Sequence, residues 1–365
     1  MIKPRIQLEG MIPFHPGEST EDLKIRYQLS SIDKMSDNEN PYGTSPNVKE
    51  AIKKNLDNLN FYPSGNCSKL VNLLAEYHQQ PIDRFIIGNG SDELIHLLAR
   101  AYINPGDEAV MADATFPRYQ TNVLIEGGRA VTVPLKEGFH DLDGLVKEIN
   151  EQTKLVFICN PNNPTGTIVG RQNLLSFIQT VPPDVLIVVD EAYAEYVTSI
   201  DYLETTSVLD QYPNLVVLRT FSKIYGLAGL RVGYGMMHPD IAKELTKAKD
   251  VFNVNYLGEL AAMTALEDQD FIKQSSFTNA EQREYLYNQL QRAGLSPFPS
   301  ETNFLFIPLK DPSSELYEAL LKNGLLVKMM SLPGIPYGMR VTLGTKEVNQ
   351  RFLQVMNFFS KESVV

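Results

Sequence analysis

Two nearly unbroken apolar segments constrain the fold more than any other feature of this chain. Residues 154–159 and 184–189 are dominated by aliphatic side chains, and each segment is followed at once by polar residues. Runs of this length and composition are typical of strands buried on both faces of a parallel sheet. Strand-like and helix-like segments alternate through the larger part of the chain, so we expect an α/β fold with a mostly parallel, mixed sheet between helices.

The residues that follow the predicted strands are the first candidates for a functional site. In an open α/β sheet, ligands bind where the strands end at their carboxyl edge. We therefore expect four polar clusters to lie along one edge of the sheet. These clusters contain Gly90, Ser91 and Asp92, then Asn160, then Asp190 and Tyr193, and finally Ser222 and Lys223.

The first cluster lies at a glycine turn between a predicted strand and a predicted helix. Free amides at a helix N-terminus form a cup for a phosphate, although a plain turn capped by Ser91 explains the same residues. The turn is not a dinucleotide fingerprint, because Glu93 occupies the position of the third glycine. A nucleotide-dependent oxidoreductase is therefore disfavoured.

The run from Arg219 to Gly235 contains the lysine on which the functional interpretation depends. Ser222 precedes Lys223 directly, Arg231 follows eight positions later, and glycines are interspersed. A lysine on a polar loop is usually a solvated charge. An amine next to a hydroxyl and close to a guanidinium instead suggests a covalent lysine beside a bound anion.

The acid at the end of the second apolar segment also requires an explanation. Carboxylates are rarely buried without a partner, and Tyr193 follows Asp190 by three residues. We therefore favour a functional role for Asp190 over a structural one.

Composition excludes several classes of protein. The chain has 365 residues, a net charge of −11 and only two cysteines. The negative charge disfavours nucleic acid and anionic membranes as main partners. The two cysteines and scattered histidines predict neither a disulfide framework nor a metal site. We find no signal peptide and no apolar stretch of membrane-spanning length, and we expect a cytoplasmic protein.

The pattern changes near residue 294, where short strand-like segments alternate with helices in a second, smaller α+β unit. We expect residues 1–35 to form an irregular N-terminal arm that is part of this small domain. Residues 36–255 then form the large domain, residues 256–293 a connecting helical region, and residues 294–365 the small C-terminal domain.

Together, these residue types match the requirements of pyridoxal 5'-phosphate. This cofactor needs a lysine for its Schiff base, an acid that keeps the pyridine nitrogen protonated, and donors for its phosphate. A protonated ring acts as an electron sink for the carbanion formed at the substrate Cα. Once released, the lysine can move a proton between that carbon and the cofactor. We expect the cation of Arg231 to lower the pKa of Lys223.

Four motifs resemble the class I/II aminotransferases of pyridoxal-phosphate fold type I, and the resemblance runs over essentially the whole chain. The motifs are Asn38-Glu-Asn-Pro-Tyr-Gly, Asn160-Pro-Asn-Asn-Pro-Thr-Gly, Asp190-Glu-Ala-Tyr and Ser222-Lys-x-x-Gly-Leu-Ala-Gly-Leu-Arg231. The resemblance implies a catalytic group of Lys223, Asp190 and Tyr193. In it, Lys223 bears the Schiff base, Asp190 pairs with the pyridine nitrogen, and Tyr193 and Asn160 bond the phenolic oxygen.

The resemblance also implies the remaining roles. Among them is a tyrosine that reaches the phosphate in the neighbouring subunit, which implies a homodimer with shared sites. The residues are Gly90, Ser91, Asp92, Ser222 and Arg231 around the cofactor phosphate, Phe116 stacked on the ring, Tyr62 for the neighbouring subunit, and Arg340, Lys328 and Asn40 for the substrate.

Within this family, the chain is most similar to the branch that acts on histidinol phosphate. The resemblance implies transfer of an amino group between histidinol phosphate and 2-oxoglutarate in histidine biosynthesis. Three positions depart from that branch: Phe14 and Phe116 replace tyrosines, and Lys328 replaces an arginine. Lysine binds phosphate as a point charge and lacks the guanidinium fork. An aromatic amino-acid aminotransferase using phenylalanine or tyrosine therefore stays open as the alternative. A non-catalytic regulator is disfavoured, because the 37 residues before Asn38 leave no room for a DNA-binding module.

Overall fold

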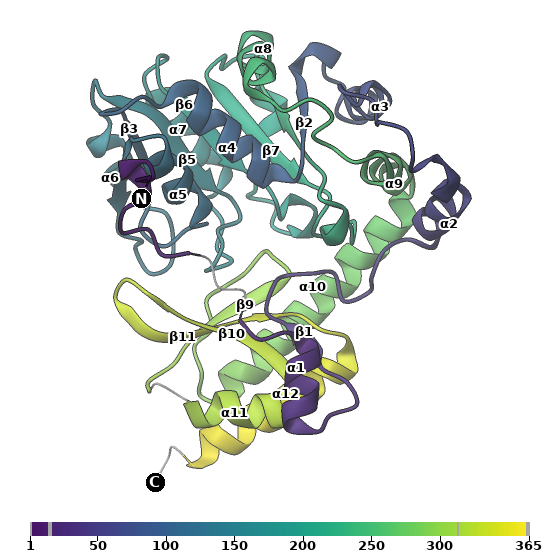
Figure 1. Cartoon of the computed structure of the whole chain (residues 1–365). Helices are drawn as coiled ribbons and strands as arrows, with labels where there is room; N and C mark the ends of the chain where they lie inside the picture. The colour runs from purple at the N-terminus through teal and green to yellow at the C-terminus, as the bar shows by residue number, and fades with distance from the viewer. Residues whose placement is uncertain (1, 14–16, 312–313, 363–365) are drawn as a thin grey trace.

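The computed structural model describes residues 2–13, 17–311 and 314–362. Phe14 therefore lies outside the described residues. The chain forms two sheets, with the larger one in the upper part of Figure 1 and the smaller one below it. No helix among the described residues is long and apolar enough to cross a membrane.

The larger sheet has seven strands, and all of them are parallel except β8, which runs antiparallel to both neighbours. This confirms the expected mostly parallel, mixed sheet. In spatial order the strands are β2 (Phe85–Gly88), β8 (Gly233–Met236), β7 (Leu215–Thr220), β6 (Leu186–Asp190), β5 (Thr153–Cys159), β3 (Glu108–Ala112) and β4 (Arg129–Val133).

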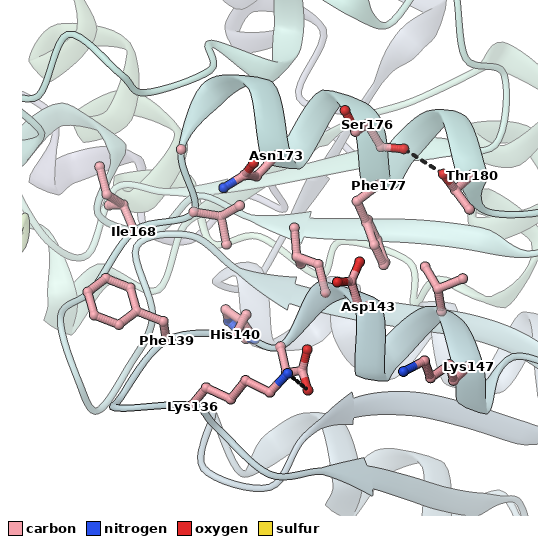
Figure 2. A pocket seen from close by; sticks show the side chains of 15 residues that line it. Lys136, Phe139, His140, Asp143, Lys147, Ile168, Asn173, Ser176, Phe177 and Thr180 are labelled. Carbon is pink, nitrogen blue, oxygen red and sulfur yellow. Dashed lines mark hydrogen bonds and ion pairs between the residues drawn. The ribbon is translucent and has the colours of Figure 1, made fainter.

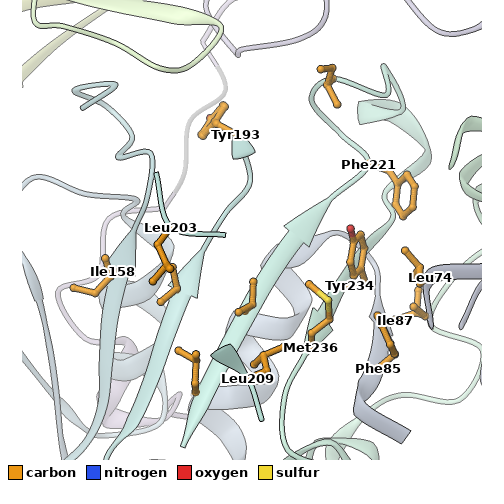
Figure 3. Packing of buried hydrophobic residues seen from close by; sticks show 14 of the residues in the cluster. Leu74, Phe85, Ile87, Ile158, Tyr193, Leu203, Leu209, Phe221, Tyr234 and Met236 are labelled. Atoms are coloured by element: carbon orange, nitrogen blue, oxygen red, sulfur yellow. The ribbon is translucent and has the colours of Figure 1, made fainter. Parts of the chain in front are cut away.

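Helices cover both faces of this sheet. Along β6, Ile187 and Val189 pack into one apolar cluster, whereas Leu186 and Val188 pack into another. This alternation explains why the strand has no polar face. The first cluster, part of which is shown in Figure 3, includes residues of α3 (Ser68–His78), α6 (Leu142–Glu148), α7 (Arg171–Thr180) and α9 (Tyr256–Glu267). The second includes residues of α4 (Ser91–Tyr102), α5 (Arg118–Ile125) and α8 (Pro239–Ala248).

The smaller sheet has four strands in the order β1 (Asp33–Met35), β10 (Leu325–Leu332), β11 (Ile335–Thr342) and β9 (Phe304–Pro308). β1 pairs in parallel with β10, and the remaining pairs are antiparallel. A separate apolar core lies between this sheet and α10 (Gln269–Arg292), α11 (Ser314–Lys322) and α12 (Lys346–Glu362). The long helix α10 runs from the larger part of the molecule into the smaller one (Figure 1).

Three local features complete the architecture. The N-terminal arm contains the helix α1 (Thr20–Tyr27) and then the strand β1, whose three residues are too few to show a strand period. The helix α2 (Pro46–Lys54) is capped by Ser45, since its hydroxyl accepts from the amide of Asn47. The run from Arg219 to Gly235 ends within strand β8.

Candidate active site

A cavity of about 520 Å³ opens at the carboxyl edge of the seven-stranded sheet, within the size range of small-molecule sites. The ends of β5, β6 and β7 and the start of α4 meet there, and the strands β10 and β11 of the smaller sheet close it. Most of the predicted site residues line this cavity: Ser91, Asp92, Phe116, Asp190, Tyr193, Ser222, Lys223, Arg231, Lys328 and Arg340.

Lys223 follows β7 and projects into the cavity. Its Nζ atom donates to the carbonyl oxygen of Asp37 at 3.2 Å and lies 5.7 Å from the ring centre of Tyr193. Burial lowers the pKa of Lys223 to about 8, and the nearby charge of Arg340 acts in the same direction. Arg231, which was expected to cause this shift, contributes less than either. The site therefore increases the neutral fraction of this amine near neutral pH compared with an ordinary lysine.

Asp190 is the last residue of β6 and is almost fully buried. Its Oδ1 atom accepts from the amide of Ala192 at 3.2 Å, and its Oδ2 atom accepts from the hydroxyl of Tyr119 at 2.8 Å. Burial raises the pKa of Asp190 to about 6, while these two hydrogen bonds oppose the shift. A buried carboxylate of this kind is suited to pairing with a cationic group of a ligand.

Tyr193 is held by a residue to which the sequence analysis gave no role. The side-chain Nδ2 atom of Asn38 donates to the Tyr193 hydroxyl at 2.9 Å, and its side-chain Oδ1 atom accepts from the hydroxyl of Thr342 at 3.0 Å. Asn38 has a φ of 61°, a left-handed conformation that asparagine tolerates better than most residues. Its motif was noticed, but the sequence did not show that the motif would meet Tyr193.

The predicted phosphate cup forms around Arg231. The Nη1 atom of Arg231 donates to the Ser222 hydroxyl at 3.2 Å. Gly90 lies so close that a Cβ atom there would be 2.4 Å from Nη2 of Arg231, and its φ is 77°. The helix α4 begins at Ser91, directly after this glycine, so its free amides adjoin the guanidinium. Asp92 lines the cavity too, in an ion pair with Arg118 at 3.1 Å.

Arg340, on β11, is half-buried at the cavity. Its Nη1 atom donates to Oδ1 of Asn163 and its Nη2 atom to the carbonyl oxygen of Ser36, both at 2.6 Å. Its guanidinium carbon lies 5.5 Å from the ring centre of Phe304. Lys328 stands opposite Arg340 in the β10–β11 register. Two cations on neighbouring strands suit this wall of the cavity to an anionic group of a substrate.

The structure corrects the placement of Asn160. Its side chain is fully buried and does not line the cavity, because its carbonyl oxygen accepts from the amide of Val169 at 2.9 Å. Asn163, three residues later, lines the cavity instead and binds Arg340. Both asparagines precede a proline in the same loop, so composition could not distinguish them.

Asn40 and Tyr62 also lie away from the cavity. The Asn40 side chain donates to the carbonyl oxygen of Ile224 at 2.7 Å and accepts from the amide of Tyr42 at 3.0 Å. It therefore holds the backbone just after Lys223 and does not line the cavity, and its contact with substrate stays a prediction. Tyr62 is 83% exposed and stacks on Phe252 at 4.8 Å, so it makes no contact with the cavity of its own chain.

A second cavity of about 650 Å³ lies between α6 and α7 and contains none of the predicted site residues (Figure 2). His140 lines it, and the His140 Nε2 atom donates to the carbonyl oxygen of Cys159 at 3.0 Å. Lys136 at its rim is paired with Asp141 at 2.8 Å. The convergent titratable groups lie in the cavity at the sheet edge, so we assign the active site there.

The fold and site define an α/β enzyme whose sheet edge gathers a buried amine, a carboxylate, a phenol and two arginines around one cavity. The family model described as aminotransferase class I and II matches residues 32–356. The chain belongs to this family.

The individual proteins that are similar to this chain are also aminotransferases. The chain is 44% identical over 356 residues to a histidinol-phosphate aminotransferase of Geobacillus thermodenitrificans, and the matched region covers 98% of each chain. It is 42% identical to the Bacillus subtilis protein of the same name, over 96% of this chain and 97% of that one. The crystal structure of histidinol-phosphate aminotransferase from Sinorhizobium meliloti, in complex with pyridoxal 5'-phosphate, is similar with a TM-score of 0.91 and 27% identity. That comparison covers 100% of this chain and 99% of the other.

Proposed function

We propose that this protein is a pyridoxal-phosphate-dependent aminotransferase that transfers an amino group between histidinol phosphate and 2-oxoglutarate. The observation that carries the proposal is the convergence of Lys223, Asp190 and Arg231 on one cavity. Relatives matched over nearly their full length carry the name of this activity, which supports the choice of substrate over an aromatic amino acid.

The residues of the cavity fit the cofactor. Gly90 leaves room for the Arg231 guanidinium where a Cβ atom would collide with it, and Ser91 and Ser222 add donors for a phosphate. Asp190 provides a buried carboxylate for the ring nitrogen, and Phe116 provides an apolar face. When bound, pyridoxal phosphate supplies an electron sink for charge that develops at the substrate Cα.

The protein's own residues supply binding and proton transfer. The Nζ atom of Lys223 is neutral over part of the physiological range, so it can accept a proton from the substrate Cα and later return it. Tyr193, oriented by Asn38, presents its hydroxyl to the cavity as a hydrogen-bond donor. Burial raises the pKa of the Tyr193 phenol, so the hydroxyl keeps its proton.

Arg340 and Lys328 provide the recognition of an anionic substrate. Asn163 and the Ser36 carbonyl oxygen hold the Arg340 guanidinium in place. Its Nε atom is buried and has no hydrogen-bond partner among the described residues, so a donor is left for a ligand. Lys328 adds a second positive charge on the neighbouring strand, which favours a doubly charged phosphate over an uncharged aromatic ring.

We also propose a homodimer in which Tyr62 reaches the site of the second subunit. Apolar side chains close to Tyr62 in sequence are exposed: Leu56 by 48%, Leu59 by 56% and Phe61 by 67%. Contiguous exposed apolar residues mark interaction surfaces. The expected division into a large domain of residues 36–255 and a small domain of residues 294–365, and the cytoplasmic location, remain proposals.

A steady-state assay tests the proposed substrate. Purified protein loaded with pyridoxal phosphate is given histidinol phosphate, phenylalanine or tyrosine, each with 2-oxoglutarate, and glutamate is measured. We expect kcat/KM to be at least about tenfold higher for histidinol phosphate, because both cations can act on its phosphate. A tenfold preference for phenylalanine would overturn the assignment of substrate.

A further inference from the structure

Tyr119 lies behind the cavity and contacts Asp190, whose carboxylate lines the cavity. It is the second residue of α5 and is 0% exposed. Its hydroxyl donates to Oδ2 of Asp190 at 2.8 Å. It does not line the cavity, whereas Asp190 does.

The ring of Tyr119 is fixed by two aromatic neighbours. It stacks on Phe157 with a centroid separation of 4.6 Å and an interplanar angle of 7°. The ring centre of Phe116, which lines the cavity, lies 5.6 Å from that of Tyr119, and the two rings meet edge-on at an interplanar angle of 79°. This packing explains an aromatic residue at position 119, but phenylalanine would serve it equally well. The hydroxyl therefore needs its own explanation, since a buried polar group costs free energy unless it is bonded.

The two oxygens of Asp190 are held from different directions. Oδ2 accepts from Tyr119 on α5, and Oδ1 accepts from the amide of Ala192 after β6. These two bonds restrict rotation of the carboxyl group. Oδ1 accepts one hydrogen bond from the described residues, at 3.2 Å, and a carboxylate oxygen can accept two, so it can take a further donor from the cavity.

The surroundings of Asp190 otherwise disfavour its charge. Glu191 follows it in sequence, Asp92 lines the same cavity, and both raise the pKa of Asp190 in addition to burial. The Cys159 thiol, paired with Asp190 in the β5–β6 register, stays neutral because burial raises its pKa to about 12. Burial also raises the pKa of Tyr119, so its hydroxyl keeps the proton that it donates.

We propose that Tyr119 is a positioning residue whose hydroxyl holds Asp190 ionised and oriented toward the ring nitrogen of the cofactor. The inference rests on the proposed function. Tyr119 touches neither cofactor nor substrate and acts only through Asp190.

The test compares Tyr119→Phe with the matched variant Tyr234→Phe. Tyr234, on β8, is also 0% exposed, and its hydroxyl is bonded at 2.9 Å to Nε2 of His78, away from the cavity. Both variants lose one buried hydroxyl bond and keep the ring. The measurements are the dissociation constant of pyridoxal phosphate, from titration of cofactor-free protein, and the pH dependence of the visible absorbance of the bound cofactor.

We expect Tyr119→Phe to weaken cofactor binding by about tenfold or more and to displace the pH midpoint of the absorbance change. We expect Tyr234→Phe to change the dissociation constant by less than about twofold, even where both variants melt at lower temperature. An unchanged Tyr119→Phe, or equal losses in both variants, would overturn the inference. Failure of the wild-type protein to bind the cofactor would instead overturn the proposed function.

A second substitution covers the case in which Tyr119→Phe does not fold. Incorporation of 3-fluorotyrosine at position 119 keeps the ring and the hydroxyl but makes the phenol a stronger donor. The pH midpoint should then move relative to the wild-type value, in the direction of a better stabilised carboxylate. An unmoved midpoint would overturn the inference.

Discussion

The guanidinium of Arg340 donates to the side chain of Asn163 at 2.6 Å, and this bond connects the two sheets across the active site. Arg340 belongs to β11 of the smaller sheet, whereas Asn163 lies in the loop after β5 of the larger one. The position of Arg340, which we propose binds the anionic substrate, therefore depends on both parts of the molecule.

The first prediction tests this bond. Replacing Asn163 by alanine removes the acceptor of Nη1, so we expect KM for the acidic substrate to rise about tenfold or more. Asn160→Ala is the matched control, because its side chain bonds only the Val169 backbone. We expect it to lower thermal stability with a smaller effect on KM. Steady-state kinetics and melting curves of both variants measure these effects, and the reverse pattern would restore Asn160 to the site.

The second prediction concerns the phosphate cup. A Cβ atom at Gly90 would lie 2.4 Å from Nη2 of Arg231, and the φ of 77° adds strain for any L-residue. We expect Gly90→Ala to displace the guanidinium and weaken pyridoxal-phosphate binding by about tenfold or more, measured by titration of cofactor-free protein. Gly229→Ala is the control in the same lysine run, since nothing lies within 4 Å of its Cβ position. Equal affinity of the two variants would contradict a role of Arg231 in binding.

The third prediction follows from the low pKa of Lys223. In cofactor-free protein, its reaction with an acylating reagent should increase with pH around a midpoint near 8, because only the neutral amine reacts. Lys53 is the internal control, since its hydrogen bond to Glu50 raises its pKa. Competitive labelling with mass spectrometry compares the two peptides. A Lys223 midpoint equal to that of Lys53 would contradict the environment described here.

The same shift has a consequence for stability. Between about pH 8 and 10.5, the unfolded chain keeps a proton on this lysine that the native state has already released. The contribution of Lys223 to the free energy of unfolding should therefore rise with pH across this window. Comparing cofactor-free wild type with Lys223→Met by denaturant titration isolates the contribution, and an opposite slope of the difference would contradict it.

The fourth prediction tests the support of Tyr193 by Asn38. Loss of the Asn38 side chain leaves the buried Tyr193 hydroxyl without its donor, at a cost of about 1–3 kcal/mol. Asn38→Ala should lose about 1–2 kcal/mol more than Asn38→Gly, because only alanine is strained at a φ of 61°. Denaturant titrations of both variants measure the difference. If the glycine variant were the less stable one, backbone strain would not be a factor here.

The sequence was sufficient for the features that depend on local pattern. The apolar runs ending at Cys159 and Asp190 predicted buried parallel strands, and both are central strands of the sheet. Because ligands bind at the carboxyl ends of the strands in an open α/β sheet, residues at the ends of neighbouring strands were expected to meet. Asp190 and Tyr193 at the end of β6 and Lys223 after β7 do line one cavity. The strand predictions depend only on the side chains within one segment, and the meeting of the strand ends follows from a general property of open α/β sheets.

The predictions that failed depend on contacts between distant segments. No local pattern shows that Asn160 turns toward Val169 while Asn163 turns toward Arg340, 177 positions away. Asn38 and Tyr119 were overlooked for the same reason, since their partners lie 155 and 71 positions away. The main cause of the lowered Lys223 pKa is burial, followed by Arg340, and neither can be read from the neighbours of the lysine in sequence.

Reduction of the cofactor-loaded protein with borohydride, followed by proteolysis and mass spectrometry, tests the central claim most directly. The reduction makes the bond between the cofactor and its lysine permanent, so the modified peptide identifies the attachment site. We predict a pyridoxyl group on the peptide that contains Lys223 and on no other peptide. A pyridoxyl group on a different lysine, or on none, would contradict the account.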